Sequence, residues 1–135
     1  MKTKPFLTLD DARAMAAAAE REALAHGWAV SIAIVDDGGH LLWLQRLDGA
    51  APISAQIAPA KARTAAVGRR ESKVYEDMIN QGRTAFLSAP FIEGLLEGAV
   101  PVMVAGQCVG AVGVSGVKSS DDVRIARAGI AALSI

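Results

Sequence analysis

Hydrophobic residues alternate with small or polar ones near the middle of the chain, and this alternation predicts a β-hairpin. β-branched residues occupy every second position from Val30 to Ile34, with Ser31 and Ala33 between them. This period of two is the pattern of a half-buried strand. An acidic, glycine-rich turn, DDGG, interrupts it, and a second apolar run, LLWL, follows at once. Because glycine accepts the positive φ of tight turns, we expect a hairpin over residues 30–47.

A second hairpin is predicted nearer the carboxyl end. Residues 99–104 read AVPVMV and residues 108–115 read CVGAVGVS. Pro101 cannot donate to a sheet ladder, which places it on an edge strand or at a strand start. The intervening Gly106-Gln107 pair has glycine first, and this order favours a two-residue turn of type II′.

Helical patterns surround the first hairpin. Residues 9–25 are rich in Ala, and Thr8 is placed to cap them, with Gly27 as a stop signal. After the hairpin, residues 60–67 have a helical composition. Pro59 leaves two possibilities for this helix, because proline is welcome at a first helical position but disrupts a helix interior. The helix therefore either starts near Pro59 or is kinked there.

Two further helices complete the predicted order of elements. Ser72 is expected to cap a helix over residues 73–81, and Ser120 a final helix over residues 121–133. The irregular stretch between residues 83 and 98 is the segment expected to cover a pocket. The order helix, hairpin, helix, helix, hairpin, helix predicts an α+β fold, with one antiparallel sheet flanked by helices.

Composition narrows the function classes. The chain has 135 residues, which predicts a single domain over residues 1–135. Its 14 basic and 14 acidic residues cancel, which argues against nucleic acid or an anionic membrane as a partner and suits self-association. The sequence shows no signal-peptide pattern and no apolar run long enough to span a membrane, so a cytoplasmic location is expected.

Several common sites are disfavoured by the residue types present. Cys108 is the single cysteine, so no internal disulfide can form, and a buried core position is its expected role. Two histidines and one cysteine cannot supply a structural zinc site. Gly110, Gly113 and Gly116 resemble neither a phosphate loop nor a dinucleotide fingerprint, and they fit close packing of a helix better.

The two histidines are candidate metal ligands, and their positions favour His40 over His26. His40 directly follows the first hairpin turn, at the rim of the sheet. It is either a surface imidazole or an axial metal ligand, and haem requires only one or two such ligands beside an apolar slot. His26 lies near the end of the first helix, where an imidazolium also interacts favourably with the helix carboxyl end.

Two basic residues are candidates for holding a carboxylate. Lys61 and Arg63 are two positions apart, so on a helix they point in different directions. Either they belong to a solvated helix face, or one of them reaches a haem propionate or an organic acid.

Four stretches together resemble the GlcG/HbpS-like haem-binding family, which also includes the C-terminal domain of PduO-type proteins. They are LTLDDAR, VSIAIVDDGGHLLWLQRLDGA, AKARTAA and GAVPVMVAGQCVGAVGVSGVKSSDDVRIARAGIAAL. The resemblance implies a profilin-like antiparallel sheet flanked by helices, homo-oligomers and, for several members, haem binding. It carries His40 over as the iron ligand, and Lys61 and Arg63 as residues beside the pocket. Pro59 and the stretch between residues 82 and 98 depart from the family pattern.

Three functions are therefore weighed. The first is a haem-binding, or related tetrapyrrole-binding, oligomeric module for sensing, storage or buffering. The second is a small-molecule enzyme, an isomerase, lyase or hydrolase acting on an organic acid, in which Lys61 or Arg63 holds the carboxylate and His40 or Asp36 serves as acid or base. The third is a structural oligomer with an unknown surface partner.

Overall fold

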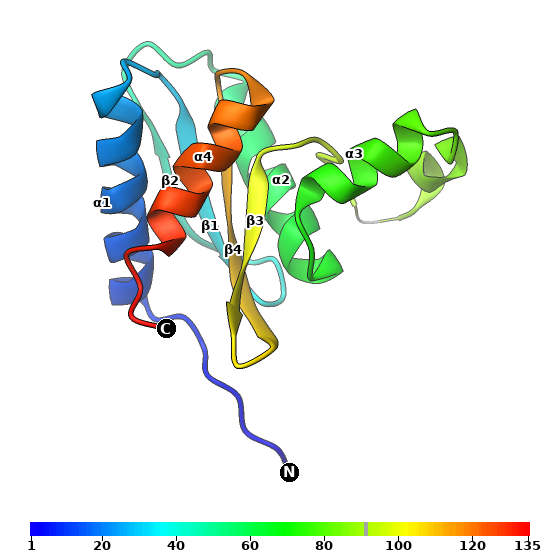
Figure 1. Cartoon of the computed structure of the whole chain (residues 1–135), viewed down its shortest axis with the longest axis horizontal. Coiled ribbons are helices and arrows are strands. Elements are labelled where there is room, and N and C mark those ends of the chain that lie inside the picture. Colours follow the sequence, from blue (N-terminus) through cyan, green and yellow to red (C-terminus); the bar gives the residue numbers. More distant parts are fainter. Residues whose placement is uncertain (91) are drawn as a thin grey trace.

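The computed structural model describes residues 1–90 and 92–135 (Figure 1). Within these residues the chain forms four α-helices, four β-strands and one short 3₁₀-helix. They follow one another as α1 (Leu9–Ala25), β1 (Ser31–Asp36), β2 (Leu41–Arg46), α2 (Ser54–Gly68), α3 (Ser72–Asn80), the 3₁₀-helix η1 (Thr84–Ser88), β3 (Ala99–Val104), β4 (Gln107–Ser115) and α4 (Ser119–Ile130). The predicted order of helices and hairpins is confirmed. No helix in this described part is long and apolar enough to cross a membrane.

The four strands form one antiparallel sheet in the order β2-β1-β4-β3. Each predicted hairpin is present, and the two hairpins join through β1 and β4 at the centre of the sheet. Pro101 lies in β3, an edge strand, as its missing N–H predicted. The α+β class with an antiparallel sheet flanked by helices is confirmed.

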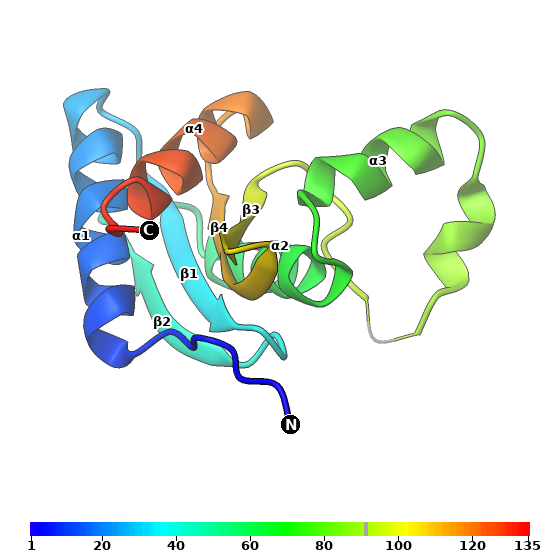
Figure 2. The ribbon, with the colours of Figure 1, turned by 60° about the horizontal axis from the view of Figure 1, so that its bottom comes forward.

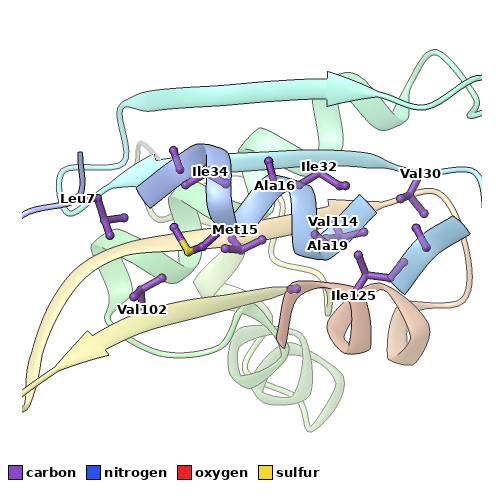
Figure 3. Packing of buried hydrophobic residues seen from close by; sticks show 14 of the residues in the cluster. Leu7, Met15, Ala16, Ala19, Val30, Ile32, Ile34, Val102, Val114 and Ile125 are labelled. Carbon is purple, nitrogen blue, oxygen red and sulfur yellow. The ribbon is translucent and has the colours of Figure 1, made fainter. Parts of the chain in front are cut away.

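Helices cover both faces of this sheet. Helices α1 and α4 lie together on one face and α2 lies on the other, while α3 and η1 extend away from the sheet as an arm (Figures 1 and 2). The larger core side chains lie between the sheet and helices α1 and α4 (Figure 3). Among them are Ile32 and Ile34 of β1, Met15 of α1 and Ile125 of α4. Their burial removes apolar surface from water, which stabilises the fold.

The face beneath α2 is built from small residues. Its buried cluster contains Ala33, Val35, Ala111 and four alanines of α2. A Cβ at Gly113 would lie 2.7 Å from the backbone nitrogen of Ala62, so α2 rests directly on the backbone of β4. The prediction that these glycines allow close helix packing is confirmed for Gly113 alone, since a Cβ at Gly110 would meet Val35 and Leu7 and one at Gly116 would meet Ala29 and Val30.

The expectation of a half-buried first strand is wrong. Residues 31–35 are all buried, including Ser31 and Ala33, which alternate with the larger residues. The physical reason is that α2 covers the face of β1 that carries the small residues, while α1 and α4 cover the other. The Ser31 hydroxyl is satisfied on the α2 side by the Ser54 hydroxyl, at 2.8 Å.

The helix starts follow the predictions in one case and depart from them in two. Thr8 caps α1 through a capping box with Asp11, as predicted. Ser72 does not cap α3, because its hydroxyl accepts a hydrogen bond from the backbone N–H of Ala99 at 3.0 Å. Ser120 is likewise not a cap, since α4 begins one residue earlier, after Lys118.

Two other local predictions are corrected. Helix α2 begins at Ser54 and continues through Pro59 to Gly68, so it does not start at the proline. The turn between β3 and β4 is formed by Ala105 and Gly106, with φ of 50° and 78°. Two successive positive φ values define a type I′ turn rather than the expected type II′ turn.

Candidate functional site

The turn between β1 and β2 places His40 at the edge of the α2 face. The Asp36 carboxylate accepts hydrogen bonds from the backbone N–H groups of Gly38 and His40, both at 2.9 Å. Gly39 adopts φ +81°, and its N–H donates to the Asp36 carbonyl oxygen at 3.0 Å. A single acidic side chain thus organises the turn from within.

The same carboxylate lies behind the His40 ring. Its Oδ1 atom is 3.3 Å from Nδ1 of His40, while 83% of the His40 side chain is exposed. A carboxylate beside Nδ1 favours a proton on that nitrogen, which leaves the lone pair on Nε2 available. Metal-binding histidines characteristically have such a carboxylate partner. The arrangement therefore suits His40 as a metal ligand whose binding nitrogen faces outward.

A half-open cleft of about 440 Å³ lies beside His40, between this hairpin and the first half of α2. Its lining is mixed, with somewhat more polar than apolar surface, and consists of Val35, Gly39, Leu41, Gln56, Pro59, Ala60, Arg63 and Glu93. His40 is not itself a lining residue: its exposed side chain lies on the hairpin that forms one wall, between the lining residues Gly39 and Leu41 in the sequence. A Cβ at Gly39 would lie 2.7 Å from Cγ of Arg63, so the Arg63 side chain lies against the turn.

The far side of the cleft comes from the irregular stretch before β3. The Thr64 hydroxyl donates to the Glu93 carbonyl oxygen. A Cβ at Gly94 would lie 2.7 Å from the backbone nitrogen of Lys61, so this stretch is seated tightly on α2. The stretch was expected to cover a pocket, and it contributes Glu93 to the cleft. Phe91, which the sequence also placed in this stretch, lies outside the described residues.

Lys61 and Arg63 point in different directions, as their spacing indicated. Arg63 is exposed beside the cleft, whereas only 4% of Lys61 is exposed. The Lys61 ammonium donates to the Val114 carbonyl oxygen at 3.0 Å and to the Asp122 carboxylate at 3.1 Å. Lys61 therefore ties α2 to β4 and α4 inside the molecule.

Asp122 is the strongly perturbed acid of this structure. Burial raises the pKa of its carboxyl group to about 6, against the opposing effect of the Lys61 ammonium. Its other oxygen accepts a hydrogen bond from the Val117 N–H at 3.2 Å. No sequence pattern marks this pair, because its members are 61 positions apart.

His26 lies in a different environment from His40. It is at the end of α1, where Nδ1 is 3.0 Å from the Glu22 carbonyl oxygen and the ring stacks on Trp28 at 4.3 Å. Because α1 covers the opposite face of the sheet from α2, His26 and the cleft lie on different faces.

Comparison with known proteins assigns this α+β chain to a defined family. A family model described as "Haem degrading protein HbpS-like" matches residues 7–131. The chain belongs to this HbpS-like family, and the resemblance stated from the sequence is confirmed.

Individual relatives agree with this assignment. The chain is 59% identical to Protein GlcG of Escherichia coli K12 over 115 residues, which is 85% of each protein. It is similar to the crystal structure of a double mutant of Streptomyces reticuli HbpS, with a TM-score of 0.90 and 33% identity, covering 100% of this chain and 92% of that one. It is also similar to the crystal structure of a PduOC:heme complex, with a TM-score of 0.84 and 25% identity over 96% of each chain.

Proposed function

We propose that this protein is a haem-binding module that senses, stores or buffers haem as a homo-oligomer. The observation that carries the proposal is the Asp36 carboxylate beside Nδ1 of the exposed His40, on the hairpin that forms one wall of the cleft. Membership of the HbpS-like family supports it, as does the similarity to the crystal structure of the PduOC:heme complex.

The residues around the cleft suit the chemical groups of haem. His40 would bind the iron through Nε2, and the exposed Leu41 side chain offers an apolar contact for a porphyrin edge. The Arg63 guanidinium would pair with a propionate. Haem would supply an iron centre able to bind small ligands and exchange electrons. The role of Lys61 in binding a ligand carboxylate stays a prediction. In this structure its ammonium already binds the Asp122 carboxylate.

A hemin titration followed by absorbance tests the axial ligand. We expect a sharp Soret band that saturates near one haem per chain and is lost in His40→Ala. His26→Ala is the matched control, because it removes an imidazole on the other face and should leave the band unchanged. A band lost only in His26→Ala would refute the assigned ligand. Broad binding that never saturates would refute the haem module itself.

A second titration tests Arg63 through the charge of the ligand. Arg63→Gln should weaken binding of haem by about tenfold, the effect of losing one charge-assisted bond. Binding of haem dimethyl ester, which has no free propionate, should be almost unaffected by the same change. The control Arg21→Gln removes an exposed arginine from α1 and should alter neither affinity. Equal loss for both ligands would remove Arg63 from the proposed propionate site.

The cleft also supports the second candidate, an enzyme acting on a small organic acid. Its volume of about 440 Å³ is in the range of small-molecule sites, and Arg63 is available for a carboxylate. Thermal stabilisation by a panel of organic acids, absent in Arg63→Gln, would favour this function over the haem module. A cytoplasmic location stays a prediction in either case.

A further inference from the structure

The arm formed by residues 72–90 stands away from the sheet and its two helical layers (Figures 1 and 2). Its base contacts α2 and β3, and its outer part is joined to α3 by aromatic contacts. The Tyr75 and Phe86 rings lie 5.0 Å apart, and the Arg83 guanidinium lies 5.8 Å from the Phe86 ring centre. An element that projects in this way exposes surface that the core of its own molecule does not cover.

An apolar crevice of about 380 Å³ lies between α3, η1 and the residues that follow the arm. Its apolar lining consists of Ile79, Leu87, Ile92, Leu95 and Leu96. Leu87 is 65% exposed and Leu96 is 44% exposed, so the crevice is open to solvent. Contiguous exposed apolar surface of this kind is typical of a contact site.

The charge of the crevice restricts what can occupy it. Both charged side chains that line it in the described part of the chain, Glu76 and Glu93, are acidic. Its occupant should therefore combine apolar side chains with positive charge, since like charges across an interface are strongly unfavourable.

The amino-terminal tail, residues 1–6, has this combination. It runs away from the body of the molecule in an extended form (Figures 1 and 2). Met1 is fully exposed and Phe6 is 75% exposed, and Lys2 is exposed between them. Lys4 pairs with Asp37, and Leu7 is buried in the core, so the base of the tail is anchored while its apolar side chains have little cover.

We propose that the tail of one copy of this chain docks in the arm crevice of a second copy. Residues 1–3, which precede the Lys4–Asp37 pair, reach about 10 Å in extended form, enough to enter a crevice of a molecule packed against this one. Met1 would supply the apolar side chain, and Lys2 would face Glu76. The inference deepens the proposed function, since it rests on the self-association proposed there and assigns it a contact.

Reciprocal charge reversal in the full-length chain tests this contact. Lys2→Glu and Glu76→Lys should each weaken self-association, measured by sedimentation equilibrium, by about tenfold, and the double variant should recover most of that loss. A role in folding alone would not produce this recovery. Glu20→Lys on α1 is the matched control and should leave the association constant unchanged.

The outcomes separate this contact from the wider proposal. If the wild type self-associates but neither single variant weakens it, the tail contact is refuted while the proposed homo-oligomer stands. Weakening in both single variants without recovery in the double variant also refutes the pairing of Lys2 with Glu76. A wild type that is monomeric at every concentration refutes both. The hemin titration is independent of all three results and still reports on the ligand.

Discussion

Asp36 shows how one side chain can serve both the fold and the site. Its carboxylate satisfies two backbone N–H groups of the turn, and it also lies 3.3 Å from the His40 ring. The amide oxygen of an asparagine can accept the same backbone hydrogen bonds but has no negative charge. Substitutions at this position can therefore separate turn formation from histidine orientation.

We expect Asp36→Asn to lower haem affinity by about tenfold while the free energy of unfolding changes little. Asp36→Ala removes the acceptor as well and should lower the free energy of unfolding by about 1–2 kcal/mol. Hemin titration and urea unfolding measure the two effects. Asp37→Asn, which changes the neighbouring acid that pairs with Lys4, is the control for haem affinity. Wild-type haem affinity in Asp36→Asn would show that the carboxylate does not support His40.

At the scale of elements, the contact between α2 and β4 depends on the absence of a side chain at Gly113. We expect Gly113→Ala to lower the free energy of unfolding by about 3 kcal/mol, because the new methyl group would overlap the backbone of α2 at Ala58 and Ala62. Thermal or urea unfolding checks this. Gly27→Ala is the control: nothing lies within 4 Å of the added carbon there, so only the strain of φ +67° remains, about 1 kcal/mol. Equal losses would mean that α2 can move away at little cost.

Pro59 is a second element-scale feature, since it lies inside α2 and lines the cleft. Proline removes a helical N–H and crowds the preceding turn. We therefore expect Pro59→Ala to raise the free energy of unfolding by about 1–2 kcal/mol and to weaken ligand binding by reshaping the cleft wall. Pro52→Ala, in the exposed turn before α2, should give no such gain. Lower stability in Pro59→Ala would show that the ring contributes packing that outweighs the lost bond.

These elements also show what the sequence can predict. Periodicity identified both hairpins and the alanine-rich helix, because each depends on neighbouring residues. It failed for the burial of β1, since the second covered face depends on α2, which comes later in the chain. It failed again at Ser72, whose hydroxyl bonds to a strand 27 positions away rather than to its own helix.

The candidate site likewise contains residues that a sequence pattern marks and residues that no pattern marks. His40 and Arg63 were singled out because local motifs and spacing mark them. Gln56 and Glu93 line the same cleft but belong to segments with no local pattern of their own. They are brought together by the Thr64 hydrogen bond and the close contact of Gly94 with α2, which only the three-dimensional structure reveals.

At the scale of the whole molecule, the buried pair of Lys61 and Asp122 joins elements from both faces of the sheet. It connects α2 with α4 and with the end of β4. Of the charged groups around Asp122, Lys61 favours its ionised form and Asp121 opposes it. Burial exceeds these effects, so the pair gives the fold a dependence on pH that arises from the interior rather than from the surface.

The direction of this dependence follows from the pKa of Asp122, which is about 6 in the folded protein and has an ordinary value of 3.8. Because the folded state holds this proton more tightly, the contribution to stability is fully present below the ordinary value and is lost as pH rises through about 6. The free energy of unfolding should therefore fall by on the order of 3 kcal/mol from this group between about pH 4 and pH 7.

Urea unfolding of wild type and Asp122→Asn across this pH range isolates the contribution of Asp122 to the free energy of unfolding, since the amide cannot ionise. Wild type should lose stability relative to the variant as pH rises, and the other carboxyl groups, common to both proteins, cancel in the difference. A single cooperative transition in both proteins is expected if residues 1–135 form the single domain predicted from the sequence. A stability difference that stays constant with pH would mean that Lys61 compensates the buried charge fully, and that the carboxylate is ionised in the folded protein throughout.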